Sequence, residues 1–360
     1  MKTALFILPT TAVGGAEKVT RILAECAAEN NIFDKIEIIF LCGRKIEESS
    51  NLKIYSNVQL TFLGAKREVF SVHKLVRRIC NERYELVFST HTHINSLLSL
   101  LRYLKILRAS RLITRESTLI FERQFGFRTK VIRSFYNFYG SQDLIICQTE
   151  RMAESFKKNT PEKLHDRVSV IENPVVFAPP VDSFGEKRTR GSDKKVLIAW
   201  CGRLVSVKNP HLAIDTIAKL NERGFVAELT FVGDGPLKLD LENHARDLGI
   251  SHLVSFVGII DRPKELFDLS TLGLITSDIE GFPNVVLEML ASKIHAVVST
   301  DCAGGLSGLP DVFVTKVNEA ETLSERIVDV LTKENCPNYQ ARAAAFFERT
   351  PRSFLHKCGI

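Results

Sequence analysis

LGLITSDIEGFPNVVLE, at residues 272–288, joins a short apolar run to a turn and to the start of a helix. The run at residues 272–276 has the length of a buried strand, and Gly281 permits a tight turn after it. Pro283 suits the first turn of a helix, because its fixed φ fits there and its missing N–H would have no partner. The stretch therefore predicts one strand, loop and helix of an α/β sheet.

The same succession recurs on both sides of this stretch. Other apolar runs in the second half of the chain lie at residues 196–201, 228–232, 254–257 and 296–299. Runs in the first half lie at residues 5–8, 35–42, 85–89, 111–114 and 144–148. Strands that alternate with helix-length segments indicate parallel sheets. We therefore predict the α/β class, with two doubly wound, Rossmann-like parallel-sheet domains.

Residues 177–195 interrupt this alternation. Two prolines, two glycines and several charges occur there without an apolar period, which is typical of a linker. The length agrees, since 360 residues exceed the usual size of one domain. We predict an N-terminal domain at residues 1–178, a linker at 179–195 and a C-terminal domain at 196–335. Within residues 336–360 we expect a last helix near 338–356, which is a candidate to cross back onto the first domain.

Composition argues against several other classes of protein. Hydrophobic residues make up 45% and charged residues 25%, as in an ordinary globular protein. The eight cysteines include no CxxC pair, and no apolar run approaches the roughly 20 residues that span a bilayer. Pro9 interrupts the N-terminal apolar run, which argues against a signal peptide. We expect a cytoplasmic protein with reduced thiols and without a metal site.

Two loops of the second half carry residues suited to a ligand, because ligands bind beyond the carboxyl ends of parallel strands. Arg203 and Lys208 follow residues 196–201. A planar guanidinium and a mobile ammonium suit a diphosphate, although they could also form a solvated surface pair. Gly233 follows residues 228–232 and allows a tight turn, which is either structural or in contact with the ligand.

The loop after residues 272–276 carries the strongest signal. Glu280 precedes the predicted helix and Glu288 lies more than one turn inside it, so one carboxylate can reach sugar hydroxyls and the other a ribose diol. The free amides of residues 282–285, at the positive end of the helix, predict a phosphate site. An acidic first turn and a surface glutamate would explain the charges, but not the Gly-Phe-Pro-Asn motif.

These residues resemble a known signature. Glu280 and Glu288, separated by seven residues, together with Gly-Phe-Pro-Asn, resemble the signature of the retaining GT-B glycosyltransferases of family 4, also called glycosyl transferases group 1. Other stretches that look like landmarks of this family, in its order, lie at residues 14–17, 171–175, 202–208 and 232–235. The resemblance covers residue 5 to about residue 305.

The resemblance implies a GT-B fold, in which two Rossmann-like domains face a central cleft, and a nucleotide-sugar donor held mainly by the C-terminal domain. Arg203 and Lys208 would hold the diphosphate, Glu288 the ribose and Glu280 the transferred sugar. Gly15 would let the N-terminal loop close over the diphosphate. The donor site implied in this way consists of Gly15, Arg203, Lys208, Gly233, Glu280, Gly281, Phe282, Pro283, Asn284, Val285 and Glu288.

The reaction implied by the resemblance is transfer with retention of configuration, without a metal or cofactor and with the leaving phosphate as proton acceptor. The expected donor is a UDP-sugar, and the transferred group a hexosyl or N-acetylhexosaminyl unit. The acceptor would be a glycan or a lipid-linked saccharide in bacterial surface polysaccharide synthesis, of the lipopolysaccharide or capsule type. The alternatives are a nucleotide-sugar epimerase with the GT-B fold and an inactive nucleotide-sugar-binding protein.

The N-terminal domain departs from some relatives, which place a histidine after the strand that here ends at residues 113–114. Arg115 and Glu116 stand there instead. His91 and His93, which follow residues 85–89, are alternative residues for the cleft, although a histidine is more often structural. The candidate catalytic residues are therefore Glu280, His91, Arg115 and Glu116.

Residues 101–140 predict a membrane-facing surface. They contain nine basic and two acidic side chains, a net charge of +7 against +6 for the whole chain, mixed with eight aromatic residues. This mixture suits the anionic inner face of the plasma membrane, where we expect peripheral binding, although it could also be a solvated face over a partly aromatic core. No nucleic-acid recognition motif accompanies the charge, so nucleic acid is not an expected partner.

Overall fold

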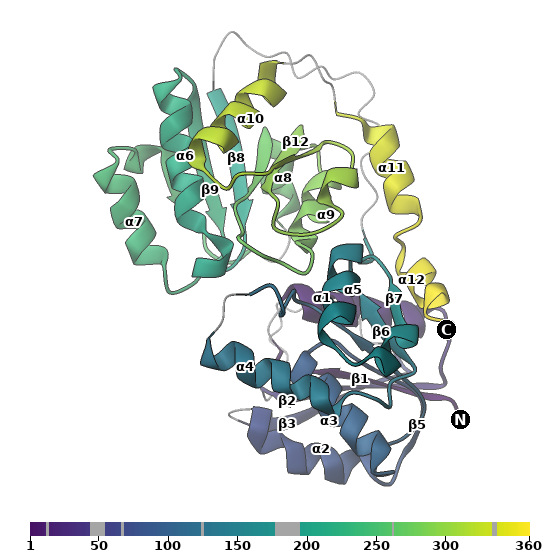
Figure 1. The fold of residues 1–360 in the computed structure, drawn as a ribbon. Coiled ribbons are helices and arrows are strands. Elements are labelled where there is room, and N and C mark those ends of the chain that lie inside the picture. Colours follow the sequence, from purple (N-terminus) through teal and green to yellow (C-terminus); the bar gives the residue numbers. More distant parts are fainter. Residues whose placement is uncertain are drawn as a thin grey trace. The chain divides into compact units, whose positions relative to one another are not determined.

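A computed structural model describes residues 1–11, 14–43, 55–65, 68–123, 126–176, 195–260, 263–332 and 337–360. The chain forms two compact units (Figure 1). One unit contains Met1–Val176 and Arg349–Ile360, and the other contains Phe177–Glu348. Apart from Lys195, the predicted linker at 179–195 lies outside the described residues.

The N-terminal unit is built on a parallel sheet that has seven strands among the described residues. The strand order is β3 (Val58–Ala65), β2 (Lys35–Cys42), β1 (Thr3–Leu8), β4 (Arg83–Ser89), β5 (Arg108–Arg115), β6 (Leu144–Cys147) and β7 (Val168–Val170). The direction of winding reverses between β1 and β4. This point is where a doubly wound sheet collects its ligand-binding loops.

Helices cover both faces of this sheet. Successive strand residues point to opposite faces, so Leu5 and Ile7 pack into one core with α2 (Val72–Ile79) and α3 (Thr92–Tyr103). Phe6 and Leu8 pack into a second core with α1 (Gly15–Glu29). The remaining long helices of the unit are α4 (Phe127–Ser134) and α5 (Glu150–Asn159). Burial on both faces explains the nearly continuous apolar runs that predicted these strands.

The C-terminal unit contains a second parallel sheet, with six strands among the described residues. The strand order is β10 (Val254–Phe256), β9 (Val226–Val232), β8 (Lys195–Cys201), β11 (Leu272–Ile275), β12 (Ala296–Thr300) and β13 (Val312–Thr315). Its helices are α6 (Pro210–Glu222), α7 (Lys238–Asp247), α8 (Lys264–Leu269), α9 (Asn284–Leu290), α10 (Ala320–Thr332) and α11 (Tyr339–Phe347). The reversal lies between β8 and β11. The predicted pair of doubly wound parallel sheets is thus confirmed.

Three edge strands were not predicted from the sequence. β3 lacks the continuous apolar run of the central strands, because apolar and polar residues alternate in its first half. β7 and β13 contain three and four residues and lie at the edges of their sheets. The fourth edge strand, β10, was predicted. The sequence therefore predicts the central strands of each sheet better than the edges.

The predicted last helix is two helices in the structure. α11 ends at Phe347, and α12 (Pro351–Lys357) begins after Thr350, whose Oγ1 accepts a 3.1 Å hydrogen bond from the Ser353 amide. Pro351 cannot continue a helix from before it, which explains the break. α11 belongs to the C-terminal unit, whereas α12 packs beside α1 in the N-terminal unit (Figure 1). Among the described residues, no helix is long and apolar enough to span a bilayer.

Candidate functional site

Three loops meet at the carboxyl edge of the C-terminal sheet. They follow β8 and β11, which flank the reversal of winding, and β9, which is the other neighbour of β8. The loops occupy residues 202–209, 233–237 and 276–283. Each loop contains residues that the sequence singled out. Because β8 lies between β9 and β11, its loop can contact both of the others.

The loops after β8 and β9 pack backbone against backbone. A Cβ on Gly233 would lie 1.9 Å from the Gly202 carbonyl oxygen, and one on Gly235 would lie 2.4 Å from the Leu204 carbonyl oxygen. The Leu204 amide donates a 3.0 Å hydrogen bond to the Asp234 carbonyl. Gly233 also has φ +132°, which side chains rarely allow. This geometry gives Gly233 a structural role, and its contact with a donor stays a prediction.

The loops after β8 and β11 are joined by three hydrogen bonds. The Thr276 hydroxyl donates to the Lys208 carbonyl at 3.0 Å, and the Asp278 amide donates to the Val207 carbonyl at 3.0 Å. The Asn209 side chain donates to Asp278 Oδ1 at 3.1 Å. Asn209 has φ +45°, a left-handed conformation that asparagine tolerates well. These contacts fix the backbone of Lys208 against the end of β11.

Lys208 and Glu280 form an ion pair. The Lys208 ammonium lies 2.6 Å from Glu280 Oε2, with 23% and 12% of the two side chains exposed. The Ser277 hydroxyl donates a 2.5 Å hydrogen bond to the other oxygen, Oε1. Both charges are therefore partly shielded from water but remain accessible, and the ammonium has three N–H donors to share with a ligand.

Glu280 is fixed at its backbone as well. Its amide donates a 2.8 Å hydrogen bond to the carbonyl of Cys302, which follows β12. Burial, and then the charge of Glu280, raises the pKa of the Cys302 thiol to about 12. Cys302 is therefore a neutral, buried neighbour of Glu280 and does not add a second negative charge beside the carboxylate. Lys208 is the charged partner of Glu280.

The other predicted donor residues surround this pair. Arg203 is exposed, and within the described part of the chain no hydrogen-bond or ion partner of its side chain is found. Glu288 lies partly buried on α9, which begins one residue after Pro283. Of the remaining residues in this loop, three are buried and two are partly buried: Gly281, Phe282 and Pro283, then Asn284 and Val285.

In the N-terminal unit, the structure brings His91 to the glycine loop. His91 occupies the N-cap position of α3. Its Nε2 lies 3.5 Å from Oε1 of Glu17, in the first turn of α1. Gly15 begins α1, and a Cβ on the preceding Gly14 would lie 2.4 Å from the Glu17 carboxylate. His93 packs its ring edge-on to that of His91. The loops after β1 and β4 therefore share one place at the reversal of winding.

Arg115 and Glu116 are buried, each with 1% of its surface exposed. The Glu116 carboxylate accepts hydrogen bonds of 2.6 Å from both Tyr136 and Tyr139, and longer ones from the Thr92 and Asn95 side chains. All of these partners are neutral. Both oxygens of the Glu116 carboxylate thus have hydrogen-bond partners in the interior. A catalytic role of Glu116 stays a prediction.

Arg115 donates to the Asn173 side chain, which in turn donates to Gln148 at 2.8 Å. Burial lowers the pKa of Arg115 to about 9, and the Glu116 charge opposes this shift. The network connects the ends of β5 and β6 to the segment after β7. Its position favours a structural role, and its catalytic role also stays a prediction.

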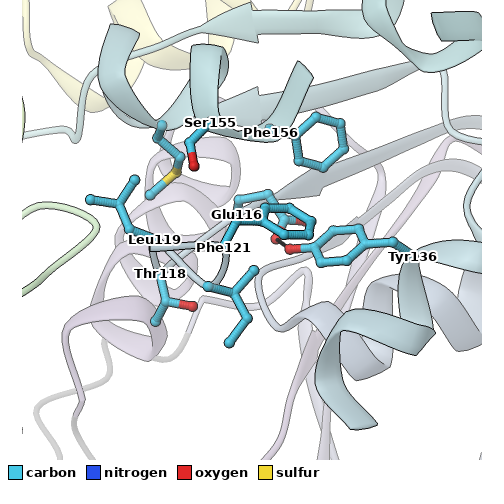
Figure 2. Close-up of a pocket in the computed structure, with 9 residues that line it drawn as sticks. Glu116, Thr118, Leu119, Phe121, Tyr136, Ser155 and Phe156 are labelled. Carbon is cyan, nitrogen blue, oxygen red and sulfur yellow. Dashed lines mark hydrogen bonds between the residues drawn. The ribbon is translucent and has the colours of Figure 1, made fainter. Parts of the chain in front are cut away.

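A small pocket that the sequence did not predict lies beside Glu116 (Figure 2). The Tyr136 hydroxyl points at the Glu116 carboxylate, and the Phe121 and Phe156 rings lie around it (Figure 2). The lining residues are Glu116, Thr118, Leu119, Ile120, Phe121, Tyr136, Met152, Ser155 and Phe156. Two of them, Phe121 and Tyr136, are among the aromatic residues of 101–140, which the sequence alone could not divide into core and surface.

The structure uses part of the basic segment internally. Arg102 pairs with Asp143, Arg111 donates to the carbonyls of Cys358 and Gly359, and Arg133 donates to the Phe121 carbonyl. With Arg115, four of the nine cations therefore stabilise the fold. Phe125 lies outside the described residues, as do the side chains of Phe127 and Arg128.

Exposed basic and aromatic residues remain in two places. One group runs from the end of α3 to the start of β5, and contains Tyr103, Leu104, Lys105 and Arg108. The other lies on α4 and the turn after it, and contains Lys130, Val131 and Phe138. Among the described residues of 101–140, these two groups are where basic side chains lie exposed beside exposed apolar or aromatic ones.

Comparison with known proteins identifies the C-terminal unit. Residues 184–345 match the family Glycosyl transferases group 1. The chain contains a glycosyl transferases group 1 domain. This domain includes the loops that carry Arg203, Lys208, Glu280 and Glu288.

Curated relatives of the glycosyltransferase domain are similar over part of their length. An N-acetyl-D-galactosaminyltransferase of Campylobacter jejuni, named for an acceptor linked to PP-undecaprenol, is 27% identical over 194 residues, 52% of each chain. EpsF of Bacillus subtilis is 32% identical over 185 residues, 50% of this chain and 48% of EpsF. The matches thus span about half the length of these relatives.

Solved structures extend the likeness to the whole fold. HepE of Anabaena in complex with UDP-glucose has a TM-score of 0.77 and 16% identity, with 100% of this chain and 98% of HepE covered. At this identity the likeness shows the fold alone, and that fold is GT-B.

Proposed function

We propose that the protein is a retaining glycosyltransferase that moves a sugar from a nucleotide-diphosphate-sugar to a glycan or lipid-linked acceptor in bacterial surface polysaccharide synthesis. The observation that carries this proposal is the Lys208 and Glu280 pair, held at the reversal of winding of a glycosyl transferases group 1 domain. A cation beside a sugar-binding carboxylate is the arrangement that a nucleotide-sugar needs at its junction of phosphate and sugar.

The cations would serve the leaving group. As the bond between the anomeric carbon and the phosphate oxygen breaks, negative charge grows on the nucleoside diphosphate, and Lys208 and Arg203 would stabilise it without a metal. The acceptor oxygen bonds to the anomeric carbon on the same face. Its proton passes to the leaving phosphate, so the products are the glycosylated acceptor and the nucleoside diphosphate.

The carboxylates would bind neutral hydroxyl groups. Glu280 would accept hydrogen bonds from the transferred sugar and Glu288 from the ribose. We propose a UDP-sugar with a hexosyl or N-acetylhexosaminyl group. The galactosaminyl group in the name of the Campylobacter jejuni relative and the UDP-glucose bound by HepE support this class.

We further propose that the N-terminal unit binds the acceptor and, peripherally, an anionic membrane. His91, beside Glu17 and the glycine loop, is the accessible candidate for the acceptor side. The two exposed basic and aromatic groups are the proposed membrane contacts. The acceptor in the name of the Campylobacter jejuni relative carries an undecaprenyl lipid, which supports a reaction at a membrane surface.

Incubation with a labelled donor tests the proposed function. UDP-glucose and UDP-N-acetylgalactosamine, each labelled in the sugar, would be incubated with the protein and a bacterial lipid extract. Release of UDP together with labelled lipid or glycan is the expected outcome. A changed sugar that stays on the nucleotide would instead establish an epimerase, and binding without any reaction would establish a nucleotide-sugar-binding protein.

A further inference from the structure

Two consecutive hydroxyl side chains, Thr276 and Ser277, follow β11 and contact the two members of the ion pair. Both residues are buried, with 0% and 2% of their surface exposed. Thr276 bonds the backbone of Lys208, and Ser277 bonds the carboxylate of Glu280. The two hydroxyl groups therefore act on the pair from the protein interior.

Thr276 uses both functions of its hydroxyl. Its Oγ1 accepts a 2.9 Å hydrogen bond from Trp200 Nε1 and donates one of 3.0 Å to the Lys208 carbonyl. Trp200 is 2% exposed, and its ring packs edge-on against Phe231 in the core. The Lys208 backbone is thus connected to a rigid part of the sheet, while its side chain keeps a flexible stem.

Ser277 divides the carboxylate of Glu280 between two partners. Its hydroxyl donates to Oε1 at 2.5 Å, whereas the Lys208 ammonium contacts Oε2 at 2.6 Å. The Ser277 carbonyl accepts a 2.6 Å hydrogen bond from the Thr300 hydroxyl at the end of β12. Glu280 therefore has a fixed plane, because each of its oxygens is held by a different neighbour.

We propose that Thr276 and Ser277 are positioning residues with separate effects on the reaction. Thr276 sets the place of Lys208 and therefore the affinity for the nucleoside diphosphate. Ser277 sets the orientation of Glu280 and therefore the rate of sugar transfer. This inference rests on the proposed function, in which Lys208 contacts the diphosphate and Glu280 the transferred sugar.

The two effects separate for a physical reason. Without the Ser277 hydroxyl, Glu280 keeps only its contact with Lys208, and its carboxylate can turn about its terminal bond. A turned carboxylate misplaces the sugar, and small misplacements of a reacting group cost rate more than binding. Without the Thr276 hydroxyl, the Lys208 carbonyl and the Trp200 N–H both lose their partner. The Lys208 backbone can then shift, and the ammonium of its side chain shifts with it.

Four variants test this division: Thr276→Val, Thr276→Ser, Ser277→Ala and Ser277→Cys. Calorimetry with UDP gives Kd, and UDP release from UDP-glucose or UDP-N-acetylgalactosamine gives kcat and KM. We expect Thr276→Val to raise Kd about tenfold, because both hydrogen bonds of the Thr276 hydroxyl are removed. Thr276→Ser keeps a hydroxyl that can make both bonds, so its Kd should stay near the wild-type value. We expect Ser277→Ala to lower kcat about tenfold with Kd for UDP nearly unchanged.

Ser324→Ala is the matched control. Ser324 is a serine of the same unit with 0% exposure, and its hydroxyl donates a 2.7 Å hydrogen bond to the Glu321 carbonyl of its own helix. The Kd and kcat of the Ser324→Ala variant should equal the wild-type values. Ser277→Cys keeps the size of the side chain but offers only a weak donor, so it should show the same fall in kcat and replaces the alanine variant if that variant does not fold.

Two results would overturn the inference. In the first, Ser277→Ala and Ser277→Cys have the same kcat as the control Ser324→Ala. In the second, Thr276→Val and Ser277→Ala each change Kd, kcat and thermal stability together, so that the two effects do not separate. Failure of the proposed function is recognised differently. In that case the wild-type protein itself neither binds UDP nor releases it from either donor, and the inference falls with it.

Discussion

The Lys208 ammonium lies 2.6 Å from the Glu280 carboxylate, although the two residues belong to loops that follow different strands. Each charge of this pair thus already has a partner within the protein. Under the proposed function, a diphosphate that binds Lys208 would have to share the ammonium with Glu280 or displace the carboxylate from it. Nucleotide binding and the orientation of Glu280 would then be coupled through this pair.

Replacement of the cation should weaken nucleotide binding. We expect Lys208→Ala to abolish most of the thermal shift that UDP produces, since a hydrogen bond to a charged group contributes about 1.5 to 3 kcal/mol. Lys219→Ala, at an exposed lysine of the same unit that pairs with Glu222, is the control and should keep the full shift. An undiminished shift in Lys208→Ala would exclude this loop as the diphosphate site.

Replacement of the carboxylate should separate binding from transfer. In Glu280→Gln the ammonium loses its anionic partner and becomes fully available to a diphosphate. We expect the affinity for UDP to stay equal or rise, while kcat for UDP release falls by at least about tenfold. Calorimetry and steady-state kinetics on one preparation measure both. A parallel loss of UDP affinity would mean that Glu280 binds the nucleotide and not the sugar.

Gly233→Ala should destabilise the C-terminal unit by about 3 kcal/mol or more, because the added Cβ would lie 1.9 Å from a backbone oxygen. Gly249→Ala provides the comparison, since Gly249 also has positive φ but nothing within 4 Å of the new atom. Urea unfolding measures both variants. Equal losses of stability would show that the loops after β8 and β9 can move apart.

Cys302 should be inert in the folded protein at mildly alkaline pH. Its pKa of about 12, raised by burial above the ordinary 9.0, keeps it a neutral thiol. The stability linked to this thiol is complete below pH 9 and is lost as the pH rises from 9 towards 12, because the unfolded state releases the proton first. Alkylation at pH 8.5, followed by mass spectrometry, should label Cys302 only after unfolding in urea. Labelling in the native state would show that the carboxyl edge of β12 opens.

Membrane binding should depend on the exposed cations that follow α3. We expect the protein to float with vesicles that contain anionic lipid, and the double variant Lys105→Glu and Arg108→Glu to float less. The double variant Lys157→Glu and Lys158→Glu, at exposed positions of α5 outside this group, makes the same change of charge and serves as the control. Equal flotation with neutral vesicles, or none with either kind, would remove the electrostatic interpretation.

Much of the fold could be predicted because it depends on local signals. Apolar runs marked the central strands, and Pro210 and Pro283 marked helix starts within one residue. Three of the four edge strands, β3, β7 and β13, were not predicted, because they lack the continuous apolar runs of strands that are buried on both faces. The break before Pro351 was not predicted, because the residues on both sides of this proline form helices.

The site could be predicted only in part. Lys208 and Glu280 stood out as charges after apolar runs, whereas Ser277 looked like any loop serine. Arg115 and Glu116 also follow a strand, and nothing in the sequence indicated that Tyr136 and Tyr139 would enclose Glu116. The sequence of residues 101–140 revealed the excess of positive charge. It did not indicate which of these arginines donate hydrogen bonds to carbonyl groups of the protein itself.

The sequence by itself determined where the central strands end and therefore which charges follow them at the carboxyl edges of the sheets. Only the tertiary structure decided that Lys208 pairs with Glu280, that Ser277 holds the second carboxylate oxygen, and that Glu116 is enclosed by tyrosines. The physical reason is the order of strands. Periodicity along the chain reports local burial, whereas neighbours at a sheet edge are set by strand order, with β8 between β9 and β11, and by packing between segments far apart in sequence.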